Sequence, residues 1–468
     1  MSAARLARLL RPRHVAFVGG RAVEPAIRNC VELGFAGDIW VVNPRYDELG
    51  GYPCHGSVAD LPDAPDAAFV GVGREAAVEV VRELAARGAG GCVCLAAGFA
   101  EVGGAGRALQ EELVRAAGDM PVVGPNCYGI LNYADRIALW PDLHGGAPVP
   151  SGAALVAQSG NLTLNATMAD RSVPFTHVLS IGNQAVTGFA TYVDALLEDP
   201  RVRAIGLYVE AIPDLVAFRA AAVRALDQGV PLVALRSGAS PVGAQVVAGH
   251  TGALVPPDAR HDELLGELGV AQVPSLTALL ESLKLFGVWQ DGSGPRLAAV
   301  AASGGDIAVL ADLAEGTVLR FPPLAVERVA ALREQLGGLV TVANPLDHNT
   351  GVWGRYDELV ACFSTVMEDD LDAVLLVSDH PRPGTGDASA WDVTIDAFVA
   401  AHERTGRRAA VVSCLPEGLP EPVRARLLAA GIPPLQGMAD AVTALDGAVR
   451  YRRRHTSASP READRAEA

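Results

Sequence analysis

Short apolar runs alternate with stretches of helix length from one end of the chain to the other. The first runs lie at residues 14–18, 39–42, 67–72, 91–95 and 121–123, and a helical stretch such as 76–87 separates neighbouring runs. Strands of a parallel sheet are covered on both faces and therefore read as nearly continuous apolar runs. The alternation predicts an α/β chain with doubly wound parallel sheets.

Two Pro- and Gly-containing breaks, at 141–152 and 290–295, divide this pattern into three parts. Between the breaks the strand-like runs are 153–157, 177–180, 204–209 and 231–235, and after them 296–301, 373–378 and 408–413. We therefore expect three α/β domains, at 1–145, 150–290 and 295–455, followed by a disordered tail at 456–468.

Composition narrows the class of protein. Of 468 residues, 50% are apolar and 20% charged, which is typical of a globular protein, and the formal net charge of -16 argues against nucleic acid or an anionic membrane as partner. No apolar run reaches the ~20 residues that span a bilayer, and the start lacks a signal-peptide core, so a cytoplasmic location is expected.

Cysteine and lysine usage argues against two kinds of site. The seven cysteines lack the paired spacing of zinc sites or disulfide frameworks, so no metal site is expected. Lys284 is the only lysine. Because P-loops and other nucleotide clamps need a placed ammonium group, the chain is not expected to hold the phosphates of ATP alone.

Three strand-to-helix turns rich in small residues are candidate anion sites, because backbone N–H groups and the helix dipole attract negative charge there. The turns are Gly19-Gly20-Arg21, Gln158-Ser159-Gly160-Asn161 and Ser303-Gly304-Gly305. Helix capping by Ser159, Asn161 or Asp306 is the structural alternative at the last two turns.

His250 is the candidate catalytic residue. It lies between Gly249 and Thr251-Gly252, which predicts a small mobile loop suited to carrying a group between two sites. A phosphohistidine needs its second ring nitrogen held, normally by a carboxylate. Glu210, at the end of the apolar strand 206–209, could do this or could cap the next element.

Five motifs in order resemble the NDP-forming acyl-CoA synthetases, which include ADP-forming acetyl-CoA synthetase and succinyl-CoA synthetase. The motifs are Gly98-Phe99-Ala100-Glu101, Gly124-Pro125-Asn126-Cys127-Tyr128-Gly129, Gln158-Ser159-Gly160, Ser180-Ile181-Gly182-Asn183 and Gly249-His250-Thr251-Gly252-Ala253. The resemblance covers residues 12 to 455, and the segments 303–305 and 344–347 also match the family pattern. It implies a Rossmann-like CoA-binding domain followed by two flavodoxin-like domains of the succinyl-CoA-synthetase type.

The resemblance also implies roles for single residues. His250 matches the phosphorylated histidine and Glu210 its orienting carboxylate, while Gln158-Ser159-Gly160 and Gly304-Gly305 match helix starts that hold the phosphoryl group. Residues matching the turns around CoA are Gly19, Gly20, Val72, Gly73, Ala97 and Gly98, and Asn126 lies in the loop between CoA and the active site.

The implied activity is that of an α-type subunit of an acid:CoA ligase. Acyl-CoA and phosphate would form acyl phosphate, which phosphorylates the histidine, and an ATP-grasp module would pass the phosphoryl group to ADP. We expect a separate β-type subunit to supply that module with ATP or ADP and magnesium, in a hetero-oligomer, or a homodimer of the chain.

Two other classes stay open. Departures from the family pattern, at Gly249, Val186, Thr191 and Val255-Pro256-Pro257, would suit a CoA or acyl-CoA binding protein that has lost catalysis. An NAD-dependent oxidoreductase would carry an acid at the end of the second strand, where this chain has Asn43-Pro44.

Overall fold

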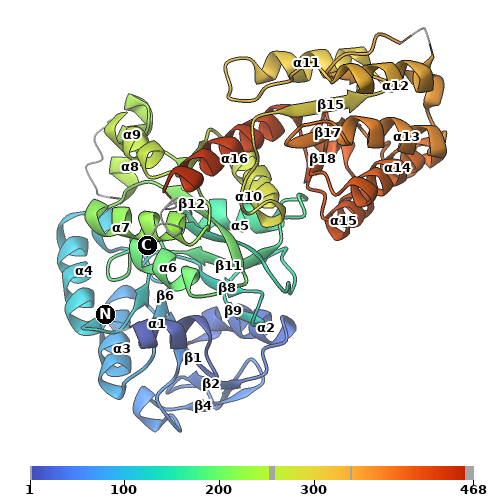
Figure 1. Ribbon diagram of the computed structural model, residues 1–468. Helices are drawn as coiled ribbons and strands as arrows, with labels where there is room; N and C mark the ends of the chain where they lie inside the picture. Colours follow the sequence, from blue (N-terminus) through green and yellow to red (C-terminus); the bar gives the residue numbers. More distant parts are fainter. Residues whose placement is uncertain (1–2, 252–258, 338–339, 459–468) are drawn as a thin grey trace, which may run out of the picture. The chain divides into compact units, whose positions relative to one another are not determined.

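The computed structural model describes residues 3–251, 259–337 and 340–458, with side chains left undescribed at 248–251 and 259–262. The described chain forms two compact units, residues 1–169 with 174–272 and residues 170–173 with 273–468. Three sheets organise them (Figure 1), and each unit is considered by itself below.

The first sheet of unit 1 has the order β3-β4-β2-β1-β5-β6-β7 and is parallel except for the β3–β4 hairpin. Its elements are α1 Ala3–Leu10, β1 His14–Gly19, η1 Arg21–Val23, α2 Glu24–Glu32, β2 Asp38–Val42, β3 Glu48–Leu49, β4 Tyr52–His55, η2 Val58–Asp60, β5 Ala67–Gly71, α3 Arg74–Arg87, β6 Cys92–Cys94, η3 Ala100–Val102, α4 Gly104–Ala117 and β7 Val122–Val123.

Strand β1 shows why this sheet is covered on both faces. Val15 and Phe17 belong to one apolar cluster and Ala16 and Val18 to another, as the two-residue period of a strand requires. The second of these clusters is filled by α3 and α4, whereas the first continues into residues of the second sheet, such as Ile130. This shared core makes unit 1 compact.

The second sheet of unit 1 has the order β14-β13-β12-β10-β11-β8-β9. Its elements are β8 Gly129–Asn132, β9 Ile137–Leu139, β10 Gly152–Ala157, α5 Gly160–Met168, β11 Phe175–Ser180, α6 Phe189–Leu197, β12 Val202–Val209, α7 Leu215–Asp227, β13 Leu232–Arg236, α8 Pro241–Thr251, α9 Ala259–Glu267 and β14 Ala271–Val273. Strand β8 runs antiparallel to its neighbours β11 and β9, so the chain enters this sheet before the predicted linker.

Unit 2 is built on the sheet β16-β15-β17-β18-β19, whose pairings are all parallel. Its elements are α10 Leu276–Val288, β15 Leu297–Ala301, α11 Gly304–Ala314, α12 Val326–Leu336, β16 Leu346–Asp347, η4 Thr350–Val352, α13 Tyr356–Met367, β17 Ala373–Val377, α14 Ser389–Thr405, β18 Ala409–Val412, η5 Pro416–Gly418, α15 Glu421–Ala429, β19 Pro434–Leu435 and α16 Met438–Ala458. Helix α16 continues past residue 456, where the tail was expected to begin, and residues 459–468 lie outside the described residues.

A buried ionic group lies inside unit 2. Lys284, on α10, pairs with Glu281 at 2.8 Å and donates to Gln436 Oε1 at 3.1 Å, and both members of the pair have fully buried side chains. Arg171 completes the group by pairing with Glu281 at 3.0 Å. Burial lowers the pKa of Lys284 to about 8, although Glu281 favours its charged form.

Candidate functional site

The residues expected around CoA lie at one edge of the first sheet. Strands β1, β5 and β6 are parallel neighbours, so Gly19, Val72 and Ala97 lie at or just beyond strand ends that share this edge. Gly19 is paired with Gly71, and a Cβ on Gly19 would lie 2.6 Å from the Gly71 carbonyl oxygen. The turn is therefore limited to glycine by close backbone packing.

Asn43 closes the same turn from β2. Its Nδ2 donates to the Gly19 carbonyl at 2.8 Å, and its Oδ1 accepts from the Arg45 N–H at 2.8 Å. An asparagine bound in this way fixes the backbone of the glycine turn. Its amide does not supply the carboxylate that a dinucleotide ribose would need.

Glu101 joins the turn at Gly98, which is expected to bind CoA, to the second sheet. Its Oε1 accepts from the Gly98 N–H at 2.6 Å and its Oε2 from Asn183 Nδ2 at 2.6 Å. Burial opposes ionisation of Glu101, but hydrogen bonds from Asn183 and from backbone N–H groups prevail and lower its pKa. On the other side of the turn, Arg74 Nη1 donates to the Gly98 carbonyl at 2.8 Å.

Three of the five motifs interlock at this point. The Asn183 N–H donates to the Pro125 carbonyl at 3.0 Å, and Asn126 Nδ2 donates to Asn183 Oδ1 at 3.4 Å. Asn126 has a left-handed backbone with φ of 57°. Val186, one of the departures, packs against the apolar cluster of the first sheet, so an apolar residue suits its surroundings.

The predicted phosphate-binding turn after β10 is a capped helix start. Ser159 accepts from the Leu162 N–H at 3.3 Å, so the capping alternative is correct for this residue, and Gly160 and Asn161 begin α5. A Cβ on Gly160 would lie 3.0 Å from the ring of Tyr128, which explains the glycine. Gln158 is buried, and its Oε1 accepts from the N–H groups of Glu210 and Ala211.

Glu210 follows β12 and is buried, with 6% of its surface exposed. Strands β10 and β12 are parallel neighbours, which places Glu210 at the same sheet edge as Gln158 and Ser159. Tyr208 is nearby, and its pKa is raised, first by burial and also by the neighbouring Glu210 carboxylate. Gln158, Ser159 and Glu210 thus lie at neighbouring strand ends, and their catalytic and phosphate-binding roles stay predictions.

His250 was expected in a loop, and this expectation is wrong for the backbone. Helix α8 runs from Pro241 to Thr251, so His250 lies in its last turn. The helix contacts η3, which carries Glu101. The His250 side chain and Val255-Pro256-Pro257 lie outside the described residues, so the predicted role of His250 stays a prediction.

The third predicted turn lies in unit 2. Ser303 caps α11 by accepting from the Asp306 N–H at 3.4 Å, so the cap is Ser303 and not Asp306. A Cβ on Gly304 would lie 3.0 Å from Asp347 Oδ2. Carboxylates of Asp347 and Asp306 beside this helix start oppose a bound phosphate, and a phosphate role for Ser303, Gly304 and Gly305 stays a prediction.

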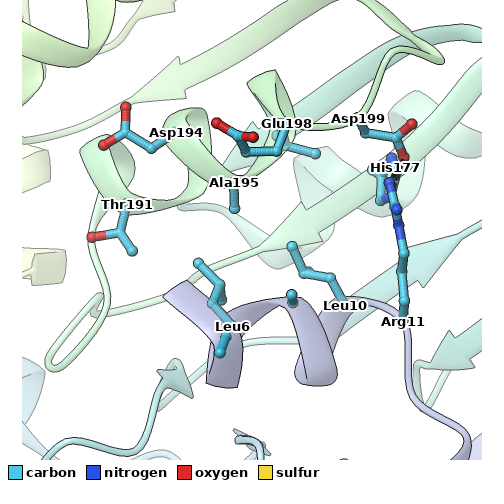
Figure 2. A pocket seen from close by; sticks show the side chains of 12 residues that line it. Leu6, Leu10, Arg11, His177, Thr191, Asp194, Ala195, Glu198 and Asp199 are labelled. Carbon is cyan, nitrogen blue, oxygen red and sulfur yellow. Dashed lines mark ion pairs between the residues drawn. The ribbon is translucent and has the colours of Figure 1, made fainter. Parts of the chain in front are cut away.

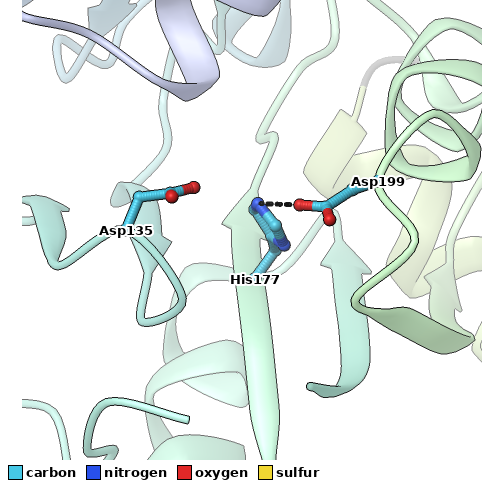
Figure 3. Close-up of side chains that lie close together, drawn as sticks. All are labelled: Asp135, His177 and Asp199. Atoms are coloured by element: carbon cyan, nitrogen blue, oxygen red, sulfur yellow. Dashed lines mark ion pairs between the residues drawn. The ribbon is translucent and has the colours of Figure 1, made fainter. Parts of the chain in front are cut away.

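A group that the sequence did not reveal combines the partly exposed Asp135 with the buried His177 and Asp199 (Figure 3). One ligand atom from each lies within 4.8 Å of the other two. Arg201 pairs with Asp135 at 2.6 Å and with Asp199 at 2.9 Å, and Arg11 pairs with Asp199 at 2.5 Å. Because two guanidinium groups already neutralise the two carboxylates, the group is a structural ion-pair network and not a metal centre. The one sign of this group in the sequence was a histidine within an apolar strand.

The network borders a cavity of about 670 Å³ between α1 and α6. Figure 2 shows Leu6 and Leu10 of α1, and Arg11 just after it, on one side and residues of α6 and the following turn, such as Asp194, on the other. None of the site residues expected from the sequence lines this cavity. The cavity is thus separate from the candidate CoA and phosphate edges.

Comparison with known families identifies two domains. Residues 13–133 match the CoA binding domain and residues 150–286 match the succinyl-CoA ligase like flavodoxin domain. The class is therefore a CoA-binding α/β protein with a flavodoxin-like succinyl-CoA-ligase domain, as predicted. No described helix combines the length and apolar character needed to cross a membrane.

Similar proteins name the family more closely. A trans-feruloyl-CoA synthase of an unknown prokaryotic organism is 35% identical over 73% of this chain and 50% of its own length. The α subunit of ADP-forming acetate–CoA ligase II from Pyrococcus furiosus is 28% identical over 66% of this chain and 68% of its own length. The chain is related to the NDP-forming acyl-CoA synthetases, and the predicted resemblance is confirmed.

Two further comparisons concern length and fold. An ADP-forming acetate–CoA ligase of Methanocaldococcus jannaschii is 27% identical over 72% of this chain and 48% of its own length, so the chain spans about half of this relative and of the feruloyl-CoA synthase. The structure of the dinucleotide-forming acetyl-coenzyme A synthetase 1 of Ca. Korarchaeum cryptofilum has a TM-score of 0.84 at 22% identity and covers 99% of this chain and 100% of that one. This likeness confirms the predicted fold class.

Proposed function

We propose that the chain is the α-type part of an NDP-forming acid:CoA ligase, which interconverts acyl-CoA, phosphate and NDP with carboxylic acid, CoA and NTP. The observation that carries the proposal is that Gln158, Ser159 and Glu210 share one sheet edge, within the unit that also contains the CoA-binding turns. Relatives named as CoA ligases support it.

The first step joins phosphate to the acyl group. A phosphate oxygen attacks the thioester carbonyl, the C–S bond breaks, and CoA leaves as a thiolate that takes up a proton. The glycine turns at Gly19, Gly20 and Gly98 would hold CoA, with Arg21, Val72, Gly73, Ala97 and Asn126 alongside. The sheet edge fits this ligand because three strand ends meet there and a glycine is required by packing.

The second step moves the phosphoryl group to His250. The neutral imidazole attacks phosphorus, the bond between phosphorus and the acyl oxygen breaks, and the carboxylic acid leaves as its anion. The proton on the other ring nitrogen would be held by the Glu210 carboxylate, which stabilises the positive charge that develops on the ring. The helix start at Ser159-Gly160-Asn161 would hold the phosphoryl oxygens.

The last step needs a nucleotide site, which we assign to an ATP-grasp module on a separate β-type subunit that binds ADP or ATP with magnesium. Relatives named as α subunits support a two-subunit enzyme. Size-exclusion chromatography of the chain with a candidate ATP-grasp protein tests this assignment, and we expect the two proteins to elute together as a hetero-oligomer. If the mixture catalyses the reaction but the two proteins form no complex, the assignment is contradicted.

The decisive test of the function is phosphorylation of the chain. Incubation with an ATP-grasp partner, CoA, a panel of carboxylic acids and labelled ATP should give a base-stable, acid-labile phosphoryl group. His250→Ala should remove the label, and Glu210→Gln should slow its appearance about 10²–10⁴-fold. Label that persists in His250→Ala contradicts the proposal.

The second candidate is a CoA or acyl-CoA binding protein without catalysis. It is favoured by Val186, a partly buried apolar residue that packs against the core of the first sheet where the family often has an acid. Calorimetry that shows CoA binding, together with no phosphorylation under the conditions above, would support this candidate. Turnover of acyl-CoA would exclude it.

A further inference from the structure

The backbone segment of Glu210 and Ala211 is bound by the side chain of Gln158. Oε1 of Gln158 accepts from the Glu210 N–H at 2.6 Å and from the Ala211 N–H at 2.9 Å. The Gln158 side chain is buried, with 5% of the residue exposed, so water does not compete for these bonds. Sequence reasoning placed Gln158 at the phosphate, but its carbonyl oxygen faces backbone N–H groups.

The same backbone segment is also bound by Gln184. Nε2 of Gln184 donates to the Ala211 carbonyl at 2.9 Å. Gln184 has a left-handed backbone with φ of 45°, an uncommon conformation for a residue with a side chain. Such a conformation persists where surrounding contacts enforce it, and it aims the Gln184 amide at Ala211.

The segment that carries Gln184 is fixed on the CoA-binding turn. Its neighbour Asn183 donates to Glu101 at 2.6 Å, and Glu101 accepts from the Gly98 N–H at 2.6 Å. The Asn183 N–H also donates to the Pro125 carbonyl at 3.0 Å. A continuous series of hydrogen bonds and covalent neighbours therefore runs from Gly98 to Glu210.

We propose that Gln158 and Gln184 are positioning residues, which hold the Glu210–Ala211 peptide and tie it to the CoA-binding turn. The inference rests on the proposed function, because it takes the Glu210 carboxylate as the group that orients His250. Both side chains are neutral amides. This matters because a carboxylate at 158 would lie near Glu210, and like charge raises the pKa of a neighbouring acid.

Two substitutions at each of the two positions separate hydrogen bonding from charge and size. Gln158→Met keeps the length but accepts no strong hydrogen bond, whereas Gln158→Glu keeps an acceptor and adds charge. Gln184→Met removes the donor, and Gln184→Glu replaces it with an acceptor. The matched control is Gln335→Met in unit 2, where Gln335 hydrogen-bonds Thr365 at 3.0 Å.

The first measurement is amide hydrogen exchange of the peptide that contains residues 210 and 211. We expect exchange about tenfold faster in Gln158→Met and in both Gln184 variants, because each loses hydrogen bonds that hold this segment, and near-wild-type exchange in Gln158→Glu. Exchange that is the same in Gln158→Met, Gln184→Met and Gln335→Met would overturn the proposal.

The second measurement is phosphorylation of the full chain by labelled acetyl phosphate, over a range of concentrations and pH. A positioning role predicts a lower maximal rate with little change in half-saturation for both methionine variants. Gln158→Glu should instead move the acidic limb of the pH profile upward. A raised half-saturation concentration alone would mark Gln158 as a phosphate ligand and overturn the positioning role.

The two measurements distinguish failure of the inference from failure of the function. Absence of label on the wild-type chain, with acetyl phosphate and with labelled ATP and a partner, counts against the proposed function. The exchange of the 210–211 peptide still decides whether the two glutamines hold it. Label on the wild type with unchanged exchange in the methionine variants refutes the inference alone.

Discussion

Lowering the pH from about 7 to about 4.5 should destabilise unit 1 through His177. This histidine lies on β11 and is buried, with 2% of the residue exposed. Burial lowers its pKa from 6.5 to about 4, with Arg201 and Arg11 acting in the same direction and the carboxylates of Asp199 and Asp135 opposing. Its Nδ1 is buried and has no hydrogen-bond partner among the described residues, so a second ring proton would have no acceptor.

The sign and size of the effect follow from the two pKa values. The folded state binds the proton more weakly than the unfolded state, so the contribution to stability is present above pH 6.5 and is lost as the pH falls towards 4. Between about pH 7 and about pH 4.5, a single group with these values loses about 2–3 kcal/mol of unfolding free energy.

The assay is urea unfolding at several pH values, followed by tryptophan fluorescence, to which the buried Trp140 of unit 1 contributes. His177→Phe and His177→Asn both remove the titrating group but change packing differently. We expect both variants to lose about 2–3 kcal/mol less than the wild type over this pH range, whatever their stability at neutral pH. If the wild type and both variants decline in parallel, His177 is not the group responsible and the reasoning fails.

Three further predictions concern the ion pairs and the CoA edge. Arg201→Met removes one of the two guanidinium partners of Asp135 and Asp199 and, because Arg201 and Asp135 are partly exposed, should cost about 1–3 kcal/mol of unfolding free energy in urea; a loss below about 0.5 kcal/mol would contradict the network's role. In Gly71→Ala the new methyl would lie 2.6 Å from Val23 Cγ1, so thermal unfolding should show a loss of about 1–3 kcal/mol, and an unchanged melting temperature would refute the packing argument. Glu101→Ala removes the acceptor for Gly98 and Asn183, and calorimetry should show CoA binding weakened about tenfold. An affinity for CoA equal to that of the wild type would show that the Glu101 hydrogen bonds do not contribute to CoA binding.

The longer strands were predictable because each buries both faces. Strands such as β1, β10 and β12 have five or more residues and read as apolar runs, and the structure confirms them. Of the strands with two to four residues, β6, β7 and β18 were predicted, whereas β3, β8 and β16 were missed. So few residues cannot establish a period, and their pairing depends on partners distant in sequence.

The candidate site also has parts that the sequence predicted and parts that it did not. The turns at Gly19, Ser159 and Ser303 were found because they follow predicted strands, and Glu210 was found at the end of another. The partners of Gln158 lie 52 and 53 residues away, so its bonds to the Glu210 peptide could not be read from neighbouring letters. His250 was taken for a loop residue because of its glycines, yet α8 includes Gly243 and Gly249.

The buried Lys284 has a consequence for an enzyme that would make acyl phosphates and acyl thioesters. Such compounds acylate free amines, and Lys284 is the only lysine of the chain, with a fully buried side chain. Acyl phosphates and acyl thioesters made by the enzyme can therefore reach a lysine side chain of this chain only when unit 2 opens. The same property gives that unit a single internal probe, since the rate at which an amine-directed acylating reagent reaches Lys284 measures how often unit 2 opens.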